Sequence, residues 1–178
     1  MENKALFTGV KDGETFEVAG IEFIKFSDEN GVTPVVAKEL QFYSSFGENN
    51  NLVESKILRR LQEEWLPKVA EAIGEENLCQ IQTDLTTLDG LKPYPELESM
   101  VSLPTFEFYR KHVEIFDRYK QGAWWWLSTP ESAQPHDNPR WVLCVSPSGN
   151  FCIDRFNCVN GVRPFLALKS SIFGPFEK

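Results

Sequence analysis

The sequence is poor in the residues that most enzymes use for acid–base and metal chemistry. It has two histidines in 178 residues, and its four cysteines show no Cys-x-x-Cys spacing. These absences argue against a zinc ribbon and against a thioredoxin-like redox motif, because both need closely spaced cysteines. We therefore expect the thiols to be reduced and buried, and they are Cys79, Cys144, Cys152 and Cys158.

Long hydrophobic runs are also missing. No window of about 18 apolar residues occurs, and the N-terminal Met-Glu-Asn-Lys is not followed by the long apolar run of a secretory signal. These absences predict a protein without a membrane span, located in the cytoplasm of a bacterium or of a phage-infected cell.

Positive charge is in short supply. The chain has 18 lysines and arginines against 26 aspartates and glutamates, which gives a formal net charge of −8 and a pI near 4.9. This excess of negative charge disfavours direct binding to nucleic acid or to an anionic membrane. It favours a basic protein partner, or imitation of nucleic acid.

Recurrent catalytic motifs are absent as well. There is no Gly-x-Ser-x-Gly sequence, and Ser148-Gly149-Asn150 suits a hairpin turn better than a phosphate-binding loop. Glu63-Glu64 together with Asp84 is a weak pattern for a metal site. His112 lies in a charged helical run and is expected on a helix surface, whereas His136 lies in a loop between aromatic strands, where binding groups often occur. The sequence predicts no enzyme, no cofactor and no metal site.

The most informative stretch covers residues 124–168. It contains three consecutive tryptophans, each able to bury about 200 Å², then an alternating segment that turns at Ser148-Gly149, and finally a Gly-Val-Arg-Pro block. Side chains alternate between the two faces of a strand, so Trp124 and Trp126 should share one side while Trp125 takes the other. Both sides of this strand must then be covered by other parts of the chain.

This order of motifs resembles DUF6273, a bacterial and phage family of unknown function. The resemblance rests on Trp-Trp-Trp-Leu-Ser-Thr-Pro at 124–130, on the strand pair around Gly149, and on Asn-Gly-Val-Arg-Pro-Phe-Leu-Ala-Leu at 160–168. It extends to Gly-Glu-Thr-Phe at 13–16, Gly-Ile-Glu-Phe at 20–23 and a helix over 52–65. The family has an arginine where this chain has Ser128, so any role of that guanidinium is absent here. Since the family has no assigned activity, the resemblance informs the fold more than the function.

The closing blocks are also similar to the end of the C-type-lectin-like fold, which formylglycine-generating enzymes share with the variable proteins of diversity-generating retroelements. By analogy with those enzymes, Cys152 and Cys158 are candidates for holding copper, since soft thiolates select Cu(I). However, the cysteine spacing differs from theirs, and Cys144 and Cys152 flank the Ser148-Gly149 turn almost symmetrically. We therefore expect Cys144 and Cys152 to be cross-strand neighbours in a core.

Upstream patterns predict strands and helices in alternation. A hairpin is expected over 15–26 with a turn at Ala19-Gly20, followed by a strand over 32–37. Residues 41–51 are expected to form a loop whose last residue, Asn51, caps an amphipathic helix over 52–65.

Further along the chain, Pro67 should stop or restart this helix, and Gly74 should close a second one over 69–73. The remaining expected elements are a strand over 79–85, a surface loop over 86–99, a buried strand over 100–103 and a helix over 106–119 with Thr105 as its N-cap. Together these patterns predict one α+β domain over residues 1–178, an antiparallel sheet with two or three helices.

We interpret the polar residues between the tryptophan block and the Gly-Val-Arg-Pro block as a partner-binding face, held rigid by the hydrophobic blocks on either side. The candidates are Glu131, His136, Asp137, Asn138, Arg140, Trp141, Asn150, Arg155 and Asn157, with Asp154, Asn160 and the possible aromatic anchor Phe156 beside them. Arg163 is expected to be structural, with its guanidinium bonding backbone carbonyls at a chain crossing.

The sequence therefore favours a non-enzymatic protein that binds a macromolecular partner, with a protein preferred over nucleic acid. One alternative is an acidic phage-encoded inhibitor of a host defence nuclease, of the anti-CRISPR type, whose carboxylates imitate nucleic acid. The acidic clusters that suit this role are Glu63-Glu64, Glu75-Glu76 and Glu96 with Glu98. The other alternative is a thiol- or copper-dependent enzyme of the formylglycine-generating type.

Overall fold

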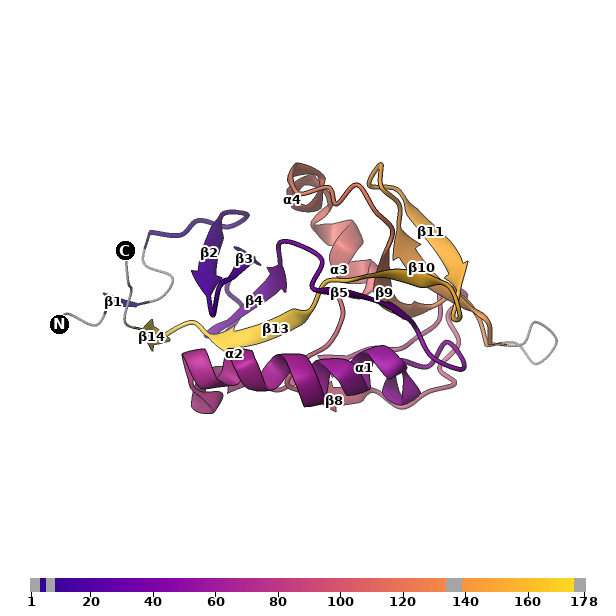
Figure 1. Cartoon of the computed structure of the whole chain (residues 1–178), viewed down its shortest axis with the longest axis horizontal. Coiled ribbons are helices and arrows are strands. Elements are labelled where there is room, and N and C mark those ends of the chain that lie inside the picture. The colour runs from indigo at the N-terminus through magenta and orange to yellow at the C-terminus, as the bar shows by residue number, and fades with distance from the viewer. Residues whose placement is uncertain (1–3, 6–8, 134–138, 175–178) are drawn as a thin grey trace.

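The computed structural model describes residues 4–5, 9–133 and 139–174, and only the backbone at 4–5 and 173–174. Two five-stranded sheets form the framework (Figure 1). The first sheet has the order β2 (Thr15–Val18), β3 (Ile21–Lys25), β4 (Val32–Ala37), β13 (Phe165–Lys169), β6 (Leu78–Cys79). The second sheet has the order β11 (Phe151–Arg155), β10 (Trp141–Val145), β9 (Trp125–Pro130), β12 (Val159–Val162), β5 (Phe42–Ser45).

Most of the strand pairing is antiparallel. Within the two sheets, only β12 and β9 run parallel. Two smaller antiparallel pairs join β1 (Lys4–Ala5) to β14 (Phe173–Gly174) and β7 (Ile81–Thr83) to β8 (Leu97–Ser99). The mixture of helices with mostly antiparallel sheets confirms the α+β prediction at that level.

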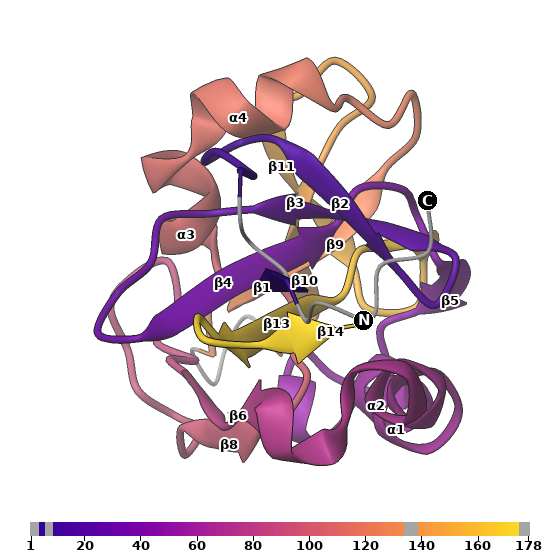
Figure 2. The same ribbon diagram turned by 90° about the vertical axis from the view of Figure 1, so that its left-hand side faces the viewer.

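Helices cover the sheets on two sides. In Figure 2 the helical segment of α1 and α2 lies below the strands, α4 lies above them, and α3 lies at the left beside β3 and β4. The helical elements are η1 (Leu52–Glu54), α1 (Lys56–Arg60), a π-helical turn (Leu61–Trp65), α2 (Leu66–Ile73), η3 (Glu75–Asn77), α3 (Phe106–Lys111) and α4 (Val113–Arg118). Among the described residues, no helix is long and apolar enough to cross a bilayer.

The tryptophan block joins two hydrophobic clusters. Trp126 is fully buried in the cluster that also contains Ile57 and Leu61 of the helical segment, whereas Trp125 packs with Tyr109 and Phe116 of α3 and α4. This opposite placement of neighbouring side chains is the alternation expected of a strand covered on both faces. Trp124 precedes the strand and stays 46% exposed.

The chain crosses from the second sheet to the first at Arg163, between β12 and β13. Its side chain is 1% exposed, and its Nε donates a hydrogen bond to the carbonyl of Ala37 at 3.0 Å. The guanidinium carbon lies 4.8 Å from the ring centroid of Trp125 and 5.3 Å from that of Phe116. The predicted structural role of Arg163, bonding a backbone carbonyl at a crossing, is therefore confirmed.

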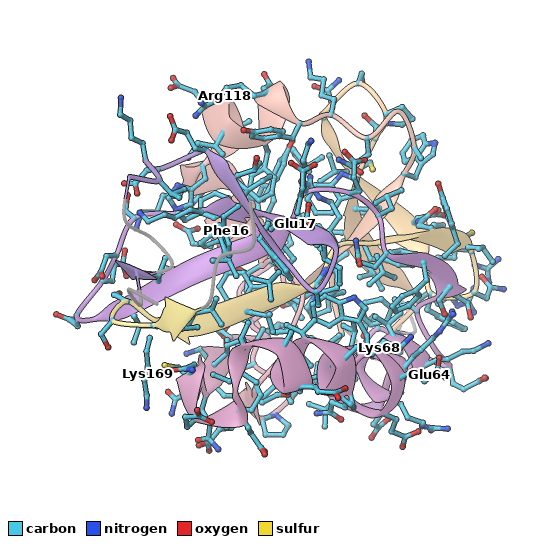
Figure 3. The ribbon with its side chains drawn as sticks, turned by 60° about the vertical axis from the view of Figure 1, so that its left-hand side comes forward. Phe16, Glu17, Glu64, Lys68, Arg118 and Lys169 are labelled. Carbon is cyan, nitrogen blue, oxygen red and sulfur yellow. The ribbon has the colours of Figure 1, made fainter. Side chains whose placement is uncertain are left out.

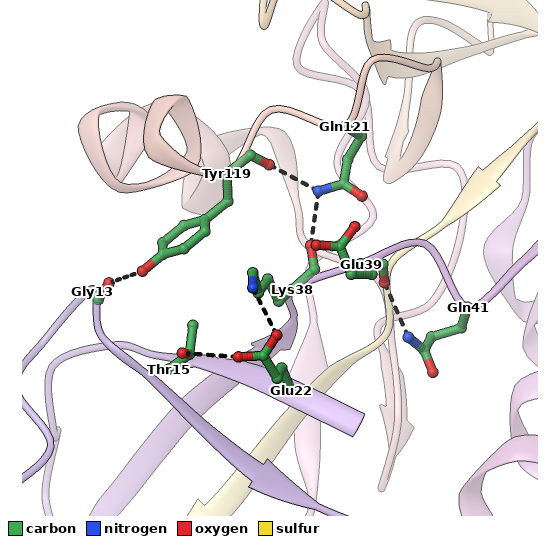
Figure 4. Close-up of polar contacts among 8 residues, drawn as sticks. All are labelled: Gly13, Thr15, Glu22, Lys38, Glu39, Gln41, Tyr119 and Gln121. Carbon is green, nitrogen blue, oxygen red and sulfur yellow. Dashed lines mark hydrogen bonds and ion pairs between the residues drawn. The ribbon is translucent and has the colours of Figure 1, made fainter. Parts of the chain in front are cut away.

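Polar contacts tie the chain after α4 to the first sheet (Figure 4). The side chain of Gln121 donates to the carbonyls of Lys38 at 2.7 Å and Tyr119 at 2.8 Å, and the Tyr119 hydroxyl donates to the carbonyl of Gly13 at 2.7 Å. An ion pair of 2.6 Å joins Lys38 to Glu22. These bonds fix α4 against the β2–β4 meander.

The N-terminal meander matches its prediction. Strands β2 and β3 pair from Thr15 to Ile24, and Ala19 and Gly20 between them both have positive φ, 54° and 72°. Two consecutive positive φ values are typical of a type I′ hairpin turn, for which glycine is well suited. The N-cap expected at Thr105 also occurs, with its side chain accepting from the backbone N–H of Phe108. Asn51 accepts from Val53 N–H and caps only the short 3-10 helix η1, whereas Ser55 is the N-cap of α1.

Residues 41–51 were expected to form a loop, and this is wrong in part because β5 occupies Phe42–Ser45. The polarity of this segment hides the strand. Ser44 is buried, yet its hydroxyl donates to the carbonyl of Ser45 at 2.8 Å and its own carbonyl accepts from Trp126 Nε1 at 2.9 Å. Hydrogen bonding thus lets a serine occupy a core-facing position.

The helix boundaries also differ from expectation. Pro67 does not stop the helical segment, but α2 restarts there as expected, with Pro67 in its opening turn directly after the π-helical turn. Proline is tolerated in a first helical turn, and the wider π turn supplies that position within a continuous segment. Conversely, the helix predicted over 106–119 is two short helices, broken at His112 with φ −118° and ψ 25°.

Two predicted strands are corrected as well. The strand expected over 79–85 is divided between β6 and β7, which belong to different sheets, with Gln80 between them. The segment 100–103 forms only one isolated bridge, between Ser102 and Phe165. The loop expected over 86–99 ends earlier, because β8 begins at Leu97.

Candidate functional site

The β10–β11 hairpin brings several of the predicted binding residues together at its open end. Trp141 begins β10 and Arg155 ends β11, and the two are direct partners in the antiparallel register. The guanidinium carbon of Arg155 lies 5.9 Å from the centroid of the Trp141 ring. An arginine held over an indole in this way keeps its hydrogen-bond donors turned toward solvent or a ligand.

Three more candidates flank this pair. The backbone N–H of Glu131 donates to the carbonyl of Trp141 at 3.0 Å, and the exposed Arg140 is fixed through its carbonyl, which accepts from Phe156 N–H at 2.9 Å. Asn157 follows Phe156 and is exposed. We call this set the hairpin end, and its members are Glu131, Arg140, Trp141, Arg155 and Asn157.

The other predicted members do not join the hairpin end. Asn150 lies at the turn side of the hairpin, and Arg155 is five positions further along the chain, or roughly 16 Å in an extended strand. Asp154 accepts from Asn160 Nδ2 at 3.1 Å, a contact that closes β11 toward β12. His136, Asp137 and Asn138 lie outside the described residues.

Phe156, which was considered as an aromatic anchor, has a structural position. Its ring is half-buried and packs against the larger hydrophobic cluster. Its carbonyl accepts from the backbone N–H groups of Phe46 at 2.7 Å and Gly47 at 3.3 Å. These bonds draw the chain after β5 against the chain after β11, so the second sheet is curled at this end.

Sequence reasoning missed Asn50, whose side chain is hydrogen-bonded to the backbone of the hairpin end. Its side chain is fully buried, and its Nδ2 donates to the carbonyls of Ser132 at 2.7 Å and Trp141 at 3.2 Å. Its Oδ1 accepts from the hydroxyl of Tyr94 at 2.6 Å. Burial raises the pKa of Tyr94, which keeps this hydroxyl protonated as a donor. In the sequence, Asn50 stands out only as one of three consecutive asparagines.

The exposed side of β11 was also missed. Phe151 is 54% exposed and Ile153 is 43% exposed, and alternation places both on the same face of the strand as Arg155. Beside them, the ring of Phe106 lies 4.9 Å from that of Phe151. The strand therefore presents an alternating row of two apolar side chains and one cation.

The outer edge of β11 is available for pairing. Backbone hydrogen bonds join Ser146 to Asn150 at one end of the β10–β11 ladder and Arg140 to Phe156 at the other. In an antiparallel ladder, hydrogen-bonded pairs alternate with pairs that are not hydrogen-bonded, so every second residue of β11 between these ends is bonded to β10. The intervening residues Phe151 and Ile153 consequently direct their backbone N–H and C=O groups away from β10. In the described part of the chain, no strand pairs with that side of β11.

The opposite edge of the sheet is less open. Tyr43 of β5 and Val159 of β12 are 56% and 65% exposed. However, the Tyr43 carbonyl is capped by Arg60 Nη1 at 3.4 Å, and the Arg60 guanidinium lies 4.2 Å from the ring centroid of Phe42. An edge capped by a charged side chain is a poor template for another strand.

A groove of about 590 Å³ opens next to Phe106 at the start of α3. Its walls carry the side chains of Thr86, Thr87, Thr105 and Thr129. Because Phe106 both lines this groove and contacts Phe151, the groove continues the exposed row of β11.

Metal-binding geometry is not found in the part of the chain that the structure describes. No three His, Cys, Asp or Glu side chains gather there in an arrangement that could hold an ion. Glu63-Glu64 and Asp84, the weak metal pattern of the sequence, lie apart on the helical segment and after β7. The candidate site is thus a surface of polar, aromatic and aliphatic groups.

Comparison with known proteins does not assign a function to this surface. No family model, no curated protein and no solved structure matches the chain. The resemblance to DUF6273 stays a prediction.

Proposed function

We propose that this protein is a non-enzymatic binding protein that recognises a protein partner through β11 and the hairpin end. The observation that carries the proposal is the row Phe151, Ile153 and Arg155, exposed on an outer strand whose backbone groups face away from the sheet. Aromatic side chains and arginine are the residue types that dominate binding energy at interfaces. The chain would act in the cytoplasm of a bacterium or of a phage-infected cell.

The proposed mode of recognition is strand addition. An extended segment of the partner pairs with the free N–H and C=O groups of β11, and its alternate side chains rest on Phe151 and Ile153. Arg155, held over Trp141, donates to a carboxylate or carbonyl of the partner. A protein suits this surface better than nucleic acid because the chain carries a net charge of −8.

The finer fold assignment belongs to the same proposal. We propose that the chain is a DUF6273-type variant of the C-type-lectin-like architecture. Its support is the sheet in which the tryptophan strand β9 lies between β10 of the hairpin and β12, the strand that leads into Arg163.

Nucleic-acid mimicry has weaker support. Figure 3 shows Glu64 and Lys68 together on the exposed side of the helical segment. Lys56 and Arg59 are exposed on the same segment, so basic groups interrupt the carboxylates of Glu63 and Glu64. A nucleic-acid mimic needs a continuous row of negative charge instead.

The enzymatic alternative has weaker support as well, since Cys158 and Cys152 are not part of a metal-binding group among the described residues. A hydrogen bond to Asp154 raises the pKa of Cys158, which disfavours the thiolate that copper needs.

A double variant on β11 tests the proposal. Ile153→Ser with Arg155→Glu should reduce capture of the partner from host lysate at least tenfold, with an unchanged melting temperature, because both side chains are exposed. The matched control is Val159→Ser with Arg59→Glu, which makes the same chemical changes at exposed positions elsewhere and should capture normally. Equal capture by the β11 variant and by the native protein would show that the face is wrongly placed.

The strand-addition mode has its own test. Ile153→Pro removes an N–H that points away from β10 and leaves the β10–β11 ladder intact, since proline is tolerated at edge positions of this kind. We expect it to abolish capture even though the apolar surface remains. Capture that persists with Ile153→Pro but is lost with Arg155→Glu would mean that side chains alone make the contact. Binding that survives about 1 M salt would further argue against charge mimicry.

A further inference from the structure

Two cysteines face each other across the β10–β11 hairpin. Cys144 and Cys152 are direct partners in the antiparallel register, and their sulfur atoms are 2.7 Å apart. This separation is shorter than an ordinary contact between two nonbonded sulfurs and longer than a disulfide bond of about 2 Å. All four cysteines of the chain are nevertheless free thiols in this structure.

The backbone already has the geometry of a disulfide. Ser146 and Asn150 form a hydrogen-bonded pair, so Cys144 and Cys152, two residues further from the turn, form a pair of the same type. The Cα atoms of such a pair are about 5.5 Å apart. That spacing lies within the range of about 4.4 to 6.8 Å found for disulfides, so the register of the two strands is compatible with a bond between these cysteines.

We propose that Cys144 and Cys152 are a redox-active dithiol that closes to a cross-strand disulfide by exchange with a small-molecule disulfide. The neighbouring thiols do not fit this role. Cys79 stands opposite Ala167 in the first sheet, and Cys158 follows β11 and is hydrogen-bonded to Asp154.

The two sulfurs have different parts in the exchange. Cys152 is half-buried on the outer strand, whereas Cys144 is fully buried beneath it. The contact between them lowers the pKa of Cys152, while that contact and burial raise the pKa of Cys144. Cys152 is therefore the thiolate that a disulfide in solution meets first.

The reaction balances without a metal or a bound cofactor. The Cys152 thiolate attacks one sulfur of the small disulfide RSSR and expels RS⁻, which leaves a mixed disulfide on Cys152. That step removes the Cys152 contact, which is the main cause of the raised pKa of Cys144, and leaves burial and the nearby Asp154 and Cys158 as the remaining causes. The Cys144 thiolate then attacks Cys152 and expels the second RS⁻. Two thiols are oxidised to one disulfide, and RSSR is reduced to two RSH that take up the two protons.

The test uses the full chain equilibrated with mixtures of oxidised and reduced glutathione, then alkylated and digested with trypsin. Cys144 and Cys152 fall in one peptide, residues 141–155, because no lysine or arginine lies between them. Cys158 falls in the next peptide. As the buffer becomes more oxidising, we expect the 141–155 peptide to lose both alkyl adducts and to appear two hydrogen masses below the unmodified dithiol peptide. Dithiothreitol before alkylation should restore the doubly alkylated form. A Cys152–Cys158 link would instead join two peptides and overturn the assignment, as would a 141–155 peptide that stays reduced in fully oxidised glutathione.

Single variants identify the attacking sulfur. Cys144→Ala should accumulate glutathione on Cys152, whereas Cys152→Ser should leave Cys144 unmodified, with alkylation of the folded protein at least roughly tenfold slower than for Cys152. The matched controls Cys79→Ser and Cys158→Ser should form the 141–155 disulfide as the native chain does. A Cys144 thiol that reacts faster than Cys152 would refute the order of attack. Because the native chain alone shows the link, a poorly folding variant does not weaken the test.

Discussion

Replacing Arg163 should separate the effect of its charge from the effect of its volume. Its guanidinium is buried with one hydrogen bond to Ala37 and contacts to two aromatic rings, and Nη2 has no hydrogen-bond partner among the described residues. No carboxylate in that part of the chain forms an ion pair with it. A buried cation without a direct ion pair is unusual, and here only the more distant charges of Glu39 and Tyr109 offset part of the lowered pKa.

The positive charge of Arg163 contributes little to the net free energy of unfolding. Burial lowers the pKa of Arg163 from 12.5 to about 10, which corresponds to about 3 kcal/mol of lost solvation at neutral pH. The bond to the backbone carbonyl contributes about 2 kcal/mol, and each aromatic contact contributes about 1 kcal/mol. These gains and the solvation loss nearly cancel. The volume of the side chain has no such offset, because removing it leaves a cavity between the two sheets.

We therefore expect Arg163→Met to lie within about 1 kcal/mol of the native protein, and Arg163→Ala to lose roughly 3 to 5 kcal/mol in free energy of unfolding. Urea denaturation followed by tryptophan fluorescence measures both, since Trp125 lies against the guanidinium. In a chain of this size, each 1 kcal/mol corresponds to about 2 to 4 °C in Tm. An Arg163→Met variant as unstable as Arg163→Ala would refute this reasoning, because the guanidinium itself would then hold the crossing together.

Three other substitutions have defined outcomes. Gly161→Ala places a Cβ 2.5 Å from a methyl carbon of Leu40, so it should destabilise by about 1 to 3 kcal/mol, and adding Leu40→Ala should recover part of the loss in the same urea assay. Tyr94→Phe leaves Oδ1 of Asn50 without its hydroxyl donor and should cost about 1 to 2 kcal/mol, whereas an unchanged unfolding midpoint would mean that Asn50 does not depend on it. Burial lowers the pKa of His112 from 6.5, so the unfolded chain takes up this proton at a higher pH than the folded one, and stability should fall as the pH drops below that value. His112→Phe should flatten this part of the stability–pH curve, and an equal slope in the variant would exclude His112 as its cause.

Sequence reasoning succeeded where structure depends on neighbours along the chain. The turn at Ala19-Gly20, the hairpin that sets Cys144 opposite Cys152, and the caps at Asn51 and Thr105 all follow from local residue types. In each case a backbone requirement or a side-chain hydrogen bond acts within a few residues. Such signals are readable without knowing the rest of the fold.

Long-range pairing could not be predicted in the same way. Strand β13 inserts between β4 and β6, and β12 pairs with β5, although more than a hundred residues separate β12 from β5 along the chain. Because Ser44 and Ser45 are polar, β5 does not look like a buried strand in the sequence. Ser44 can lie in the core because of hydrogen bonds, one of which comes from the distant Trp126. Asn50 is a similar case, since its three partners come from segments far along the chain.

The candidate site shows the same division. Alternation along β11 indicates that Phe151, Ile153 and Arg155 share a face, but not that this face is exposed. Exposure depends on how far α3 reaches over the sheet, and Phe106 covers only the Phe151 end. The sequence therefore identifies the strand, and the tertiary packing decides which side of it is exposed.

The proposed dithiol and the proposed binding row lie on opposite faces of β11. Cys152 alternates with Phe151 and Ile153, so the dithiol lies on the inner side of the strand and the proposed binding row lies on its outer side. A disulfide at Cys152 ties β11 to the buried β10 midway between the hairpin turn and Arg155, without touching any group offered to a partner. An edge strand held in this way loses less conformational freedom on binding, because part of that freedom has already been removed. Oxidation should consequently strengthen capture of the partner in the native chain and leave it unchanged in Cys152→Ser, which forms neither the disulfide nor a glutathione adduct on β11. Weaker capture after oxidation would mean that strand addition requires β11 to move.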